Sequence, residues 1–171
     1  MSLSLRQGLT PGLLIVSIAL LSSLIPGGPI ENREFGHLGV AAVLTFNIFL
    51  AALILTSVFA VVLTWKRSHF GGGLAFLCSI GFAGVYLLDL LEIFPTSPTA
   101  MSAPLYYVES IGLIVAGLLM AASKPLKLSK RDARTARAQH RPFSLSVQTV
   151  FVVLAVTVGI VVFATVSALG V

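Results

Sequence analysis

The sequence predicts an all-α integral membrane protein: a polytopic bundle of five transmembrane helices. The mean hydropathy is +1.02, and only 10% of the residues are charged, whereas about a quarter are charged in soluble domains. Five apolar stretches approach or exceed the roughly 20 residues that a helix needs to cross a bilayer. The charges between these stretches also sort by sign from one connection to the next.

The charge pattern predicts the topology. Ten of the eleven basic residues lie at Arg6, in the link 66–67 or in the segment 124–141. Arg33 is the exception, and it lies among the acidic residues of the alternate connections. Because basic loops stay in the cytoplasm, we expect a cytoplasmic N-terminus, a cytoplasmic loop at 123–142 and an extracytoplasmic C-terminus.

The first two predicted spans are residues 9–25 and 36–64. The first is short, and the run Pro26-Gly27-Gly28-Pro29 ends it, because proline and glycine break helices. We interpret it as a span rather than a cleaved signal peptide. The second is long enough to tilt, and Trp65 follows it as tryptophan often does at a membrane interface.

The remaining predicted spans are residues 71–94, 105–122 and 143–169. The third and fourth form a hairpin through a loop rich in proline, serine and threonine. The fifth is rich in valine, but an isolated apolar segment in lipid must be helical to satisfy its own backbone. We therefore treat residues 1–171 as a single membrane domain.

The candidate site is a cluster of carboxylates and a histidine. Folding the hairpin brings Asp89 and Glu109 to one depth, on the order of 7 Å below their helix ends. Asp89 and Glu92 are three residues apart and should share a helix face. Glu34 and His37 have the same spacing. The candidate residues are thus Glu34, His37, Asp89, Glu92 and Glu109.

Three interpretations of this cluster stay open. The Glu-x-x-His spacing is half of the pattern that binds metal in di-iron bundles, and buried carboxylates also relay protons. His37 and Glu92 are expected near the helix ends in water. Asp89 and Glu109 lie deeper and should face protein, where one of them takes up a proton or a cation lies between them. Glu31 is placed in a solvated loop.

Two further residues lie inside predicted spans. Asn47 should bond another helix through its amide. Cys78 is the only cysteine, so it forms no intrachain disulfide and is expected to be a small apolar residue, either buried or facing lipid. No motif identifies a cofactor. A metal is undetermined, and a quinone or pigment site is left open.

The basic loop carries more charge than orientation requires. Its cations are expected to contact anionic lipid headgroups or an acidic partner. Nucleic acid is not expected as a partner, because the positive charge lies beside membrane spans and serves topology. The residues are Lys124, Lys127, Lys130, Arg131, Arg134, Arg137 and Arg141.

The sequence favours a small non-catalytic membrane subunit or an assembly factor of a larger membrane protein complex. Small residues recur at four-residue spacing, as in Gly112 with Ala116 and Ala155 with Gly159, and this spacing lets helices approach closely. The alternatives are a small transporter or ion-conducting protein that uses the outer carboxylates, and a metal-dependent membrane enzyme. The expected location is the plasma membrane, as a multi-pass protein of a prokaryotic inner or cytoplasmic membrane.

Overall fold

The described part of the chain is entirely helical. The computed structural model describes residues 3–26, 30, 31, 33, 35–66, 68–123 and 147–170. Within these ranges there are five α-helices and one short 3₁₀ helix. They are α1 (Leu3–Ser23), η1 (Gly36–Leu38), α2 (Val40–Trp65), α3 (His69–Leu90), α4 (Ala103–Ser123) and α6 (Val147–Leu169).

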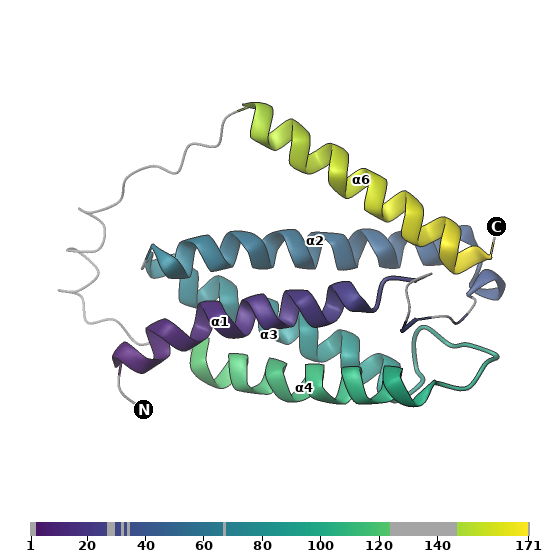
Figure 1. Cartoon of the computed structure of the whole chain (residues 1–171), viewed down its shortest axis with the longest axis horizontal. Coiled ribbons are helices and arrows are strands. Elements are labelled where there is room, and N and C mark those ends of the chain that lie inside the picture. Colours follow the sequence, from purple (N-terminus) through teal and green to yellow (C-terminus); the bar gives the residue numbers. More distant parts are fainter. Residues whose placement is uncertain are drawn as a thin grey trace.

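The helices run along one axis and reverse direction from one to the next (Figure 1). Helices α1 to α4 pack together, and α6 lies against α2. We call one end of the bundle the acidic end; it holds residues 30–39, 91–102 and the end of α6. The opposite end, with the start of α1, the link after Trp65 and the end of α4, is called the basic end.

Three helices are long and apolar enough to cross a membrane: α2, α3 from Phe70 onward, and α4. The parts Gly8–Ser23 of α1 and Val153–Leu169 of α6 are shorter apolar helices. Large apolar side chains cover the outside of the bundle, including Ile48, Leu77 and Ile114. A soluble monomer rarely exposes so much contiguous apolar surface. The chain is therefore a membrane protein.

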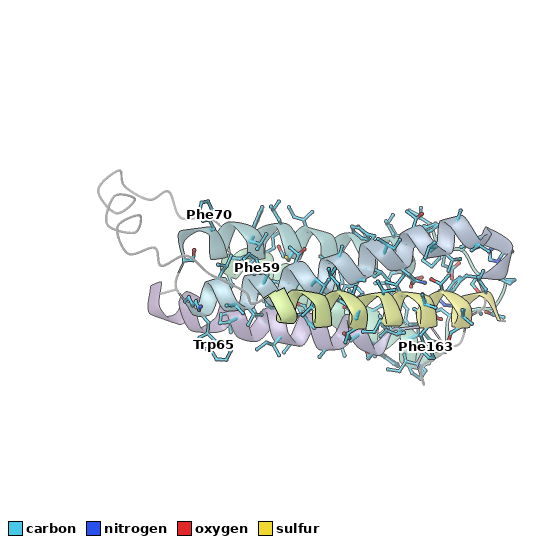
Figure 2. The ribbon with its side chains drawn as sticks, turned by 90° about the horizontal axis from the view of Figure 1, so that it is seen from above. Phe59, Trp65, Phe70 and Phe163 are labelled. Carbon is cyan, nitrogen blue, oxygen red and sulfur yellow. The ribbon has the colours of Figure 1, made fainter. Side chains whose placement is uncertain are left out.

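Inside the bundle, the core joins α1 to α4. Leu14 of α1, Phe82 of α3 and Leu119 of α4 are completely buried and belong to one apolar cluster. Aromatic side chains instead point outward at several places. Figure 2 shows Trp65 and Phe70 projecting from opposite sides of the bundle near the basic end. Tyr106 and Tyr107 are exposed at the acidic end, and amphipathic rings at both ends are typical of membrane interfaces.

Helix α6 packs unevenly over residues 153–169, the part whose side chains the structure describes. The buried residues in this part are Val161, Ala164, Thr165 and Ala168, all toward the acidic end. From Val153 to Ile160 the side chains are exposed, except Thr157, which is half-buried. Figure 1 shows α6 diverging from α2 toward its N-terminal end. Residues 153–160 of α6 are thus largely free of the bundle that the other helices form.

Helix α3 ends earlier than the sequence predicts. The predicted span reaches residue 94, but the helix stops at Leu90. Glu92 takes the left-handed conformation with φ 53°. Its N–H bonds the carbonyl of Asp89, and the N–H of Ile93 bonds that of Leu88. These are the two hydrogen bonds of a Schellman C-cap, which usually has glycine at the left-handed position.

We expect Glu92→Gly to stabilise the protein by about 1 kcal/mol, because glycine adopts a left-handed conformation without steric cost. The Glu92 side chain is exposed, so little packing is lost. Thermal unfolding of the solubilised protein measures the gain. Gly39 provides the converse: its φ is 80° and a Cβ atom there would meet nothing within 4 Å, so Gly39→Ala should destabilise through backbone strain alone. A lower melting temperature for Glu92→Gly would contradict the prediction.

The link between α2 and α3 depends on one glycine. A Cβ atom at Gly71 would lie 2.8 Å from the backbone nitrogen of Thr64 and 2.9 Å from the carbonyl carbon of Leu63. Those atoms belong to the last turns of α2, so they cannot rotate away. The first turn of α3 can therefore approach α2 closely only when residue 71 has no side chain.

We expect Gly71→Ala to destabilise the protein by roughly 1–3 kcal/mol, because the two helices must separate to admit the methyl group. Gly73 is the matched control on the same helix, since a Cβ there meets nothing within 4 Å. Gly73→Ala should be neutral or stabilising by up to about 1 kcal/mol, the difference in helix propensity. Equal melting temperatures for the two variants would contradict this account.

Candidate functional site at the acidic end

A buried ion network lies at the acidic end, with Arg33 at its centre. Arg33 Nη2 is 2.6 Å from Glu31 Oε2 and 2.8 Å from Asp89 Oδ2. Arg33 Nη1 donates to Asp89 Oδ1 at 3.0 Å, and Nε donates to Glu31 Oε1 at 2.9 Å. The planar guanidinium thus makes a bidentate pair with each carboxylate, the geometry that gives arginine its strongest pairings. The network links the connection between α1 and α2, which we call the first acidic-end connection, to α3.

All three members of this network are buried. The exposed fraction is 6% for Arg33, 4% for Glu31 and 9% for Asp89. Burial alone would lower the pKa of Arg33, but hydrogen bonds and charge from Glu31 and Asp89 outweigh it and raise the pKa above its ordinary value. The guanidinium also lies 5.3 Å from the centre of the Phe35 ring. Arg33 is therefore a permanent, desolvated cation.

Glu109 of α4 approaches the same arginine without pairing closely with it. Its Oε1 atom is 4.0 Å from Arg33 Nη2. Its side chain is 1% exposed, and Oε2 has no hydrogen-bond partner in the described structure. Asp89 and Glu109 thus both approach the Nη2 atom of Arg33, and both side chains face protein. This is the placement that the hairpin geometry predicts for these two residues.

Tyr86 of α3 is the second polar group without a partner here. Its side chain is completely buried, and its hydroxyl makes no hydrogen bond within the described residues. The ring packs on Gly112 of α4, where a Cβ atom would lie 2.5 Å from Tyr86 Cζ. A glycine at this position therefore lets the tyrosine ring lie flat against α4.

Both unpartnered groups line a cavity of about 50 Å³ at the acidic end. Its walls come from the end of α1, from the first acidic-end connection and the connection between α3 and α4, from α2, α3 and α4, and from Ala168 of α6. Four aromatic rings line it: Phe35, Phe46, Tyr86 and Phe94. Glu31, Asp89 and Glu109 contribute carboxyl groups. The cavity is an apolar, aromatic space with negative charge along its polar wall.

Two other predicted site residues, His37 and Glu92, do not join this cluster. His37 is exposed in η1, with Nε2 3.4 Å from Thr96 Oγ1. Glu92 is exposed as well. The prediction that Asp89 and Glu92 share a helix face is wrong, because α3 ends between them. Glu34 lies outside the described residues. The predicted role of the five residues as one cluster stays a prediction.

Glu31 and Arg33 correct the sequence-based interpretation. Glu31 was placed in a solvated loop, but it is buried and bonded to Arg33. Arg33 appeared only as the exception to the charge pattern. That exception could have predicted the network, because a single cation among several acidic residues at one end can pair with their carboxylates. Its distance of 56 residues from Asp89 hid the pairing in the sequence.

Asn47 makes the interhelical hydrogen bond that the sequence predicts. Its Nδ2 atom donates to Thr165 Oγ1 at 3.1 Å, which joins α2 to α6. Cys78 is buried in the core, as expected. The seven basic residues Lys124, Lys127, Lys130, Arg131, Arg134, Arg137 and Arg141 lie outside the described residues.

In the described ranges, no three His, Cys, Asp or Glu side chains are arranged to hold a metal ion. What the geometry offers instead is hydrogen bonding and charge. Glu109 has a free acceptor and Tyr86 a free hydroxyl. The three carboxyl groups outnumber the one arginine. The arrangement suits a proton or a small cation with hydrogen-bond donors.

Fold and site together define a helical membrane protein with a charged network buried at one end. Residues 6–141 match the sequence profile of a family described as a domain of unknown function, DUF8051. The match covers most of the chain, which therefore belongs to this family. It includes α1 to α4 and ends before α6. No curated protein and no solved structure matches the chain.

Proposed function

We propose that the protein is a small non-catalytic subunit, or an assembly factor, of a larger membrane protein complex. In this proposal all five helices cross the bilayer. The basic end, with the N-terminus, faces the cytoplasm, as the positive-inside rule requires. The acidic end and the C-terminus are extracytoplasmic, and the membrane is the plasma membrane of a prokaryotic cell.

The observation that carries this proposal is the exposed segment 153–160 of α6, which we call the free half of this helix. A helix that leaves its own bundle presents its sides to whatever lies next to it in the membrane. Ala155 and Gly159 lie on this half at four-residue spacing, and both are exposed. A Cβ atom at Gly159 would meet nothing within 4 Å. Such spacing lets a second helix approach closely.

Two of the other small-residue pairs show the contrast, whereas Gly117 and Ala121 of α4 are exposed like the pair on α6. Gly112 and Ala116 are buried inside the bundle, and Gly112 packs against α3. Ala164 and Ala168 are buried in the half of α6 near the acidic end. These two buried pairs thus already allow close packing between helices of this protein. The free pair on α6 has the same chemistry and supports contact with a helix of another protein.

Native mass spectrometry of the gently solubilised full chain tests the proposal. We expect the chain together with at least one other protein at a fixed ratio. Gly159→Leu should reduce that assembly, because a bulky side chain blocks close approach. Gly84→Leu is the matched control, since Gly84 is also helical with nothing within 4 Å of its Cβ position. Monomers or homo-oligomers alone would contradict the proposal.

A second candidate function is a small transporter or ion-conducting protein. The specific observation that favours it is the unpartnered oxygen of Glu109 beside the cavity. Flux through liposomes that contain the purified chain tests it. Conduction that disappears in Glu109→Gln supports this candidate. Liposomes with the wild-type chain that are as tight as empty ones would contradict it.

The basic loop gives a third element of the proposal. We expect Lys130, Arg131, Arg134 and Arg137 to bind anionic headgroups or an acidic partner, each contributing about 1 kcal/mol. Replacing the four with glutamine should weaken retention of anionic lipid or loosen the complex. Added salt should act on the wild type in the same way. Unchanged lipid retention and complex recovery would leave topology as the loop's only role.

A further inference from the structure

We propose that the acidic-end cavity binds a small primary ammonium ion, such as methylammonium or ethylammonium, between Glu109 and Tyr86. This inference is independent of the subunit proposal. It would name the ligand of the second candidate function, but binding can occur without transport.

The first step concerns the size of the cavity. A single water needs roughly 10–15 Å³ of such space, so a cavity of about 50 Å³ accommodates a group of only a few heavy atoms. The backbone around it is fixed by Arg33 on one side and by the packing of Tyr86 on Gly112 on the other. The space is therefore small and already formed.

The second step concerns the missing hydrogen bonds. Nearly all buried polar side-chain atoms in proteins have a partner. Tyr86 and Glu109 are 0% and 1% exposed and line the same cavity, yet the Tyr86 hydroxyl and Glu109 Oε2 have no partner among the described residues. Arg33 does not supply the donor: four of its five N–H groups bond Glu31 and Asp89, and its Nη2 atom is 4.0 Å from Glu109 Oε1, too far for a hydrogen bond. The site lacks an N–H or O–H group between Glu109 and Tyr86.

The third step concerns charge. Glu31, Asp89 and Glu109 carry three carboxyl groups around one guanidinium. When all are ionised, the buried group has an excess of negative charge, which is costly in a desolvated place. Glu31 and Asp89 are each neutralised in part by bidentate pairing with Arg33. Glu109 has no such pairing and lies beside the cavity, so an ionised Glu109 would be the carboxylate without a counter-charge.

The fourth step selects the class of cation. A resident Ca²⁺ usually takes about six to eight oxygen ligands at once, and the described residues bring no three His, Cys, Asp or Glu side chains together for a metal ion. An ammonium ion instead needs a few acceptors and gains from aromatic faces. The rings of Phe35, Phe46 and Phe94 line the cavity. Its N–H groups would donate to Glu109 Oε2 and to the Tyr86 oxygen, and a short alkyl group would lie against the rings.

Isothermal titration calorimetry on the full chain in detergent tests the proposal, with ethylammonium chloride as the probe and sodium chloride as the reference salt. We expect saturable binding of ethylammonium and none of sodium. Tetramethylammonium, which has no N–H donor, should bind more weakly. Glu92→Gln, at the same end but exposed, should leave the affinity unchanged.

The variants decide whether the ion lies in this cavity. Glu109→Gln should weaken binding by about tenfold or more, because a charged acceptor is lost. If that variant fails to fold, Tyr86→Phe decides instead, since it removes only the hydroxyl and should weaken binding severalfold. Equal affinity in the wild type and the folded variants would overturn the proposal. So would a wild type that binds no ethylammonium, the result expected when a proton on Glu109 balances the charge.

Discussion

Replacing Arg33 with glutamine should lower the free energy of unfolding by roughly 3–5 kcal/mol, the cost of removing one partner from a buried ion pair. Glu31 and Asp89 would stay buried without their cation, and each would lose two hydrogen bonds to it. Arg33→Lys should cost less, because the charge is kept. It should still be destabilising, since a lysine cannot form two bidentate pairs.

Cys78 offers a direct measurement of this effect. It is the only cysteine and is 2% exposed, so a thiol-reactive fluorescent probe labels it only when the bundle opens. Heating the solubilised variants with the probe gives their melting temperatures. Glu92→Gln is the control for loss of a charge at the same end without loss of a buried pair. A melting temperature for Arg33→Gln equal to that of the control would show that the network does not stabilise the fold.

Gly112→Ala should also destabilise the bundle, by roughly 1–3 kcal/mol or more. The added methyl group would lie 2.5 Å from Tyr86 Cζ and 2.6 Å from Cε2. The Tyr86 ring is completely buried, so either the ring must shift toward the cavity or α3 must separate from α4. The same thiol-labelling melt measures the change.

Gly117 provides the matched control for this substitution. It lies on the same helix, it is exposed, and a Cβ atom there meets nothing within 4 Å. Gly117→Ala should raise stability slightly through helix propensity. The prediction fails when Gly112→Ala melts at or above the temperature of Gly117→Ala. It also fails when adding Tyr86→Leu, which shortens the side chain, does not raise the melting temperature of the Gly112→Ala variant.

The helices could be predicted from the sequence because hydropathy acts locally. The segments predicted at 36–64 and 105–122 correspond to α2 with η1 and to α4 within a few residues. The end of α3 could not be predicted as well. Leu91 to Phe94 are apolar enough to extend a helix, except for Glu92. The chain instead turns at Glu92 in a conformation that favours glycine, so the sequence carries no signal for the turn.

Some features of the candidate site could likewise be predicted from the sequence, and others could not. The depth of Asp89 and Glu109 follows from the length of the hairpin between them. The contribution of Arg33 and Glu31 depends on a connection that folds back onto α3, and helical periodicity says nothing of such a contact. Tyr86 was missed because a tyrosine inside an apolar span looks like a core residue. Its role depends on Gly112 on another helix, whose small size predicts close packing but not the partner.

Photocrosslinking from α6 tests the central proposal most directly. A photoreactive residue at position 159, on the free half of α6, should give an adduct with one other membrane protein, and that protein should be the one found at fixed ratio by native mass spectrometry. The same residue at position 77, on the exposed face of α3, should react with lipid. Adducts from position 159 with lipid alone, or only with a second copy of this chain, would contradict the assignment as a subunit of a larger complex.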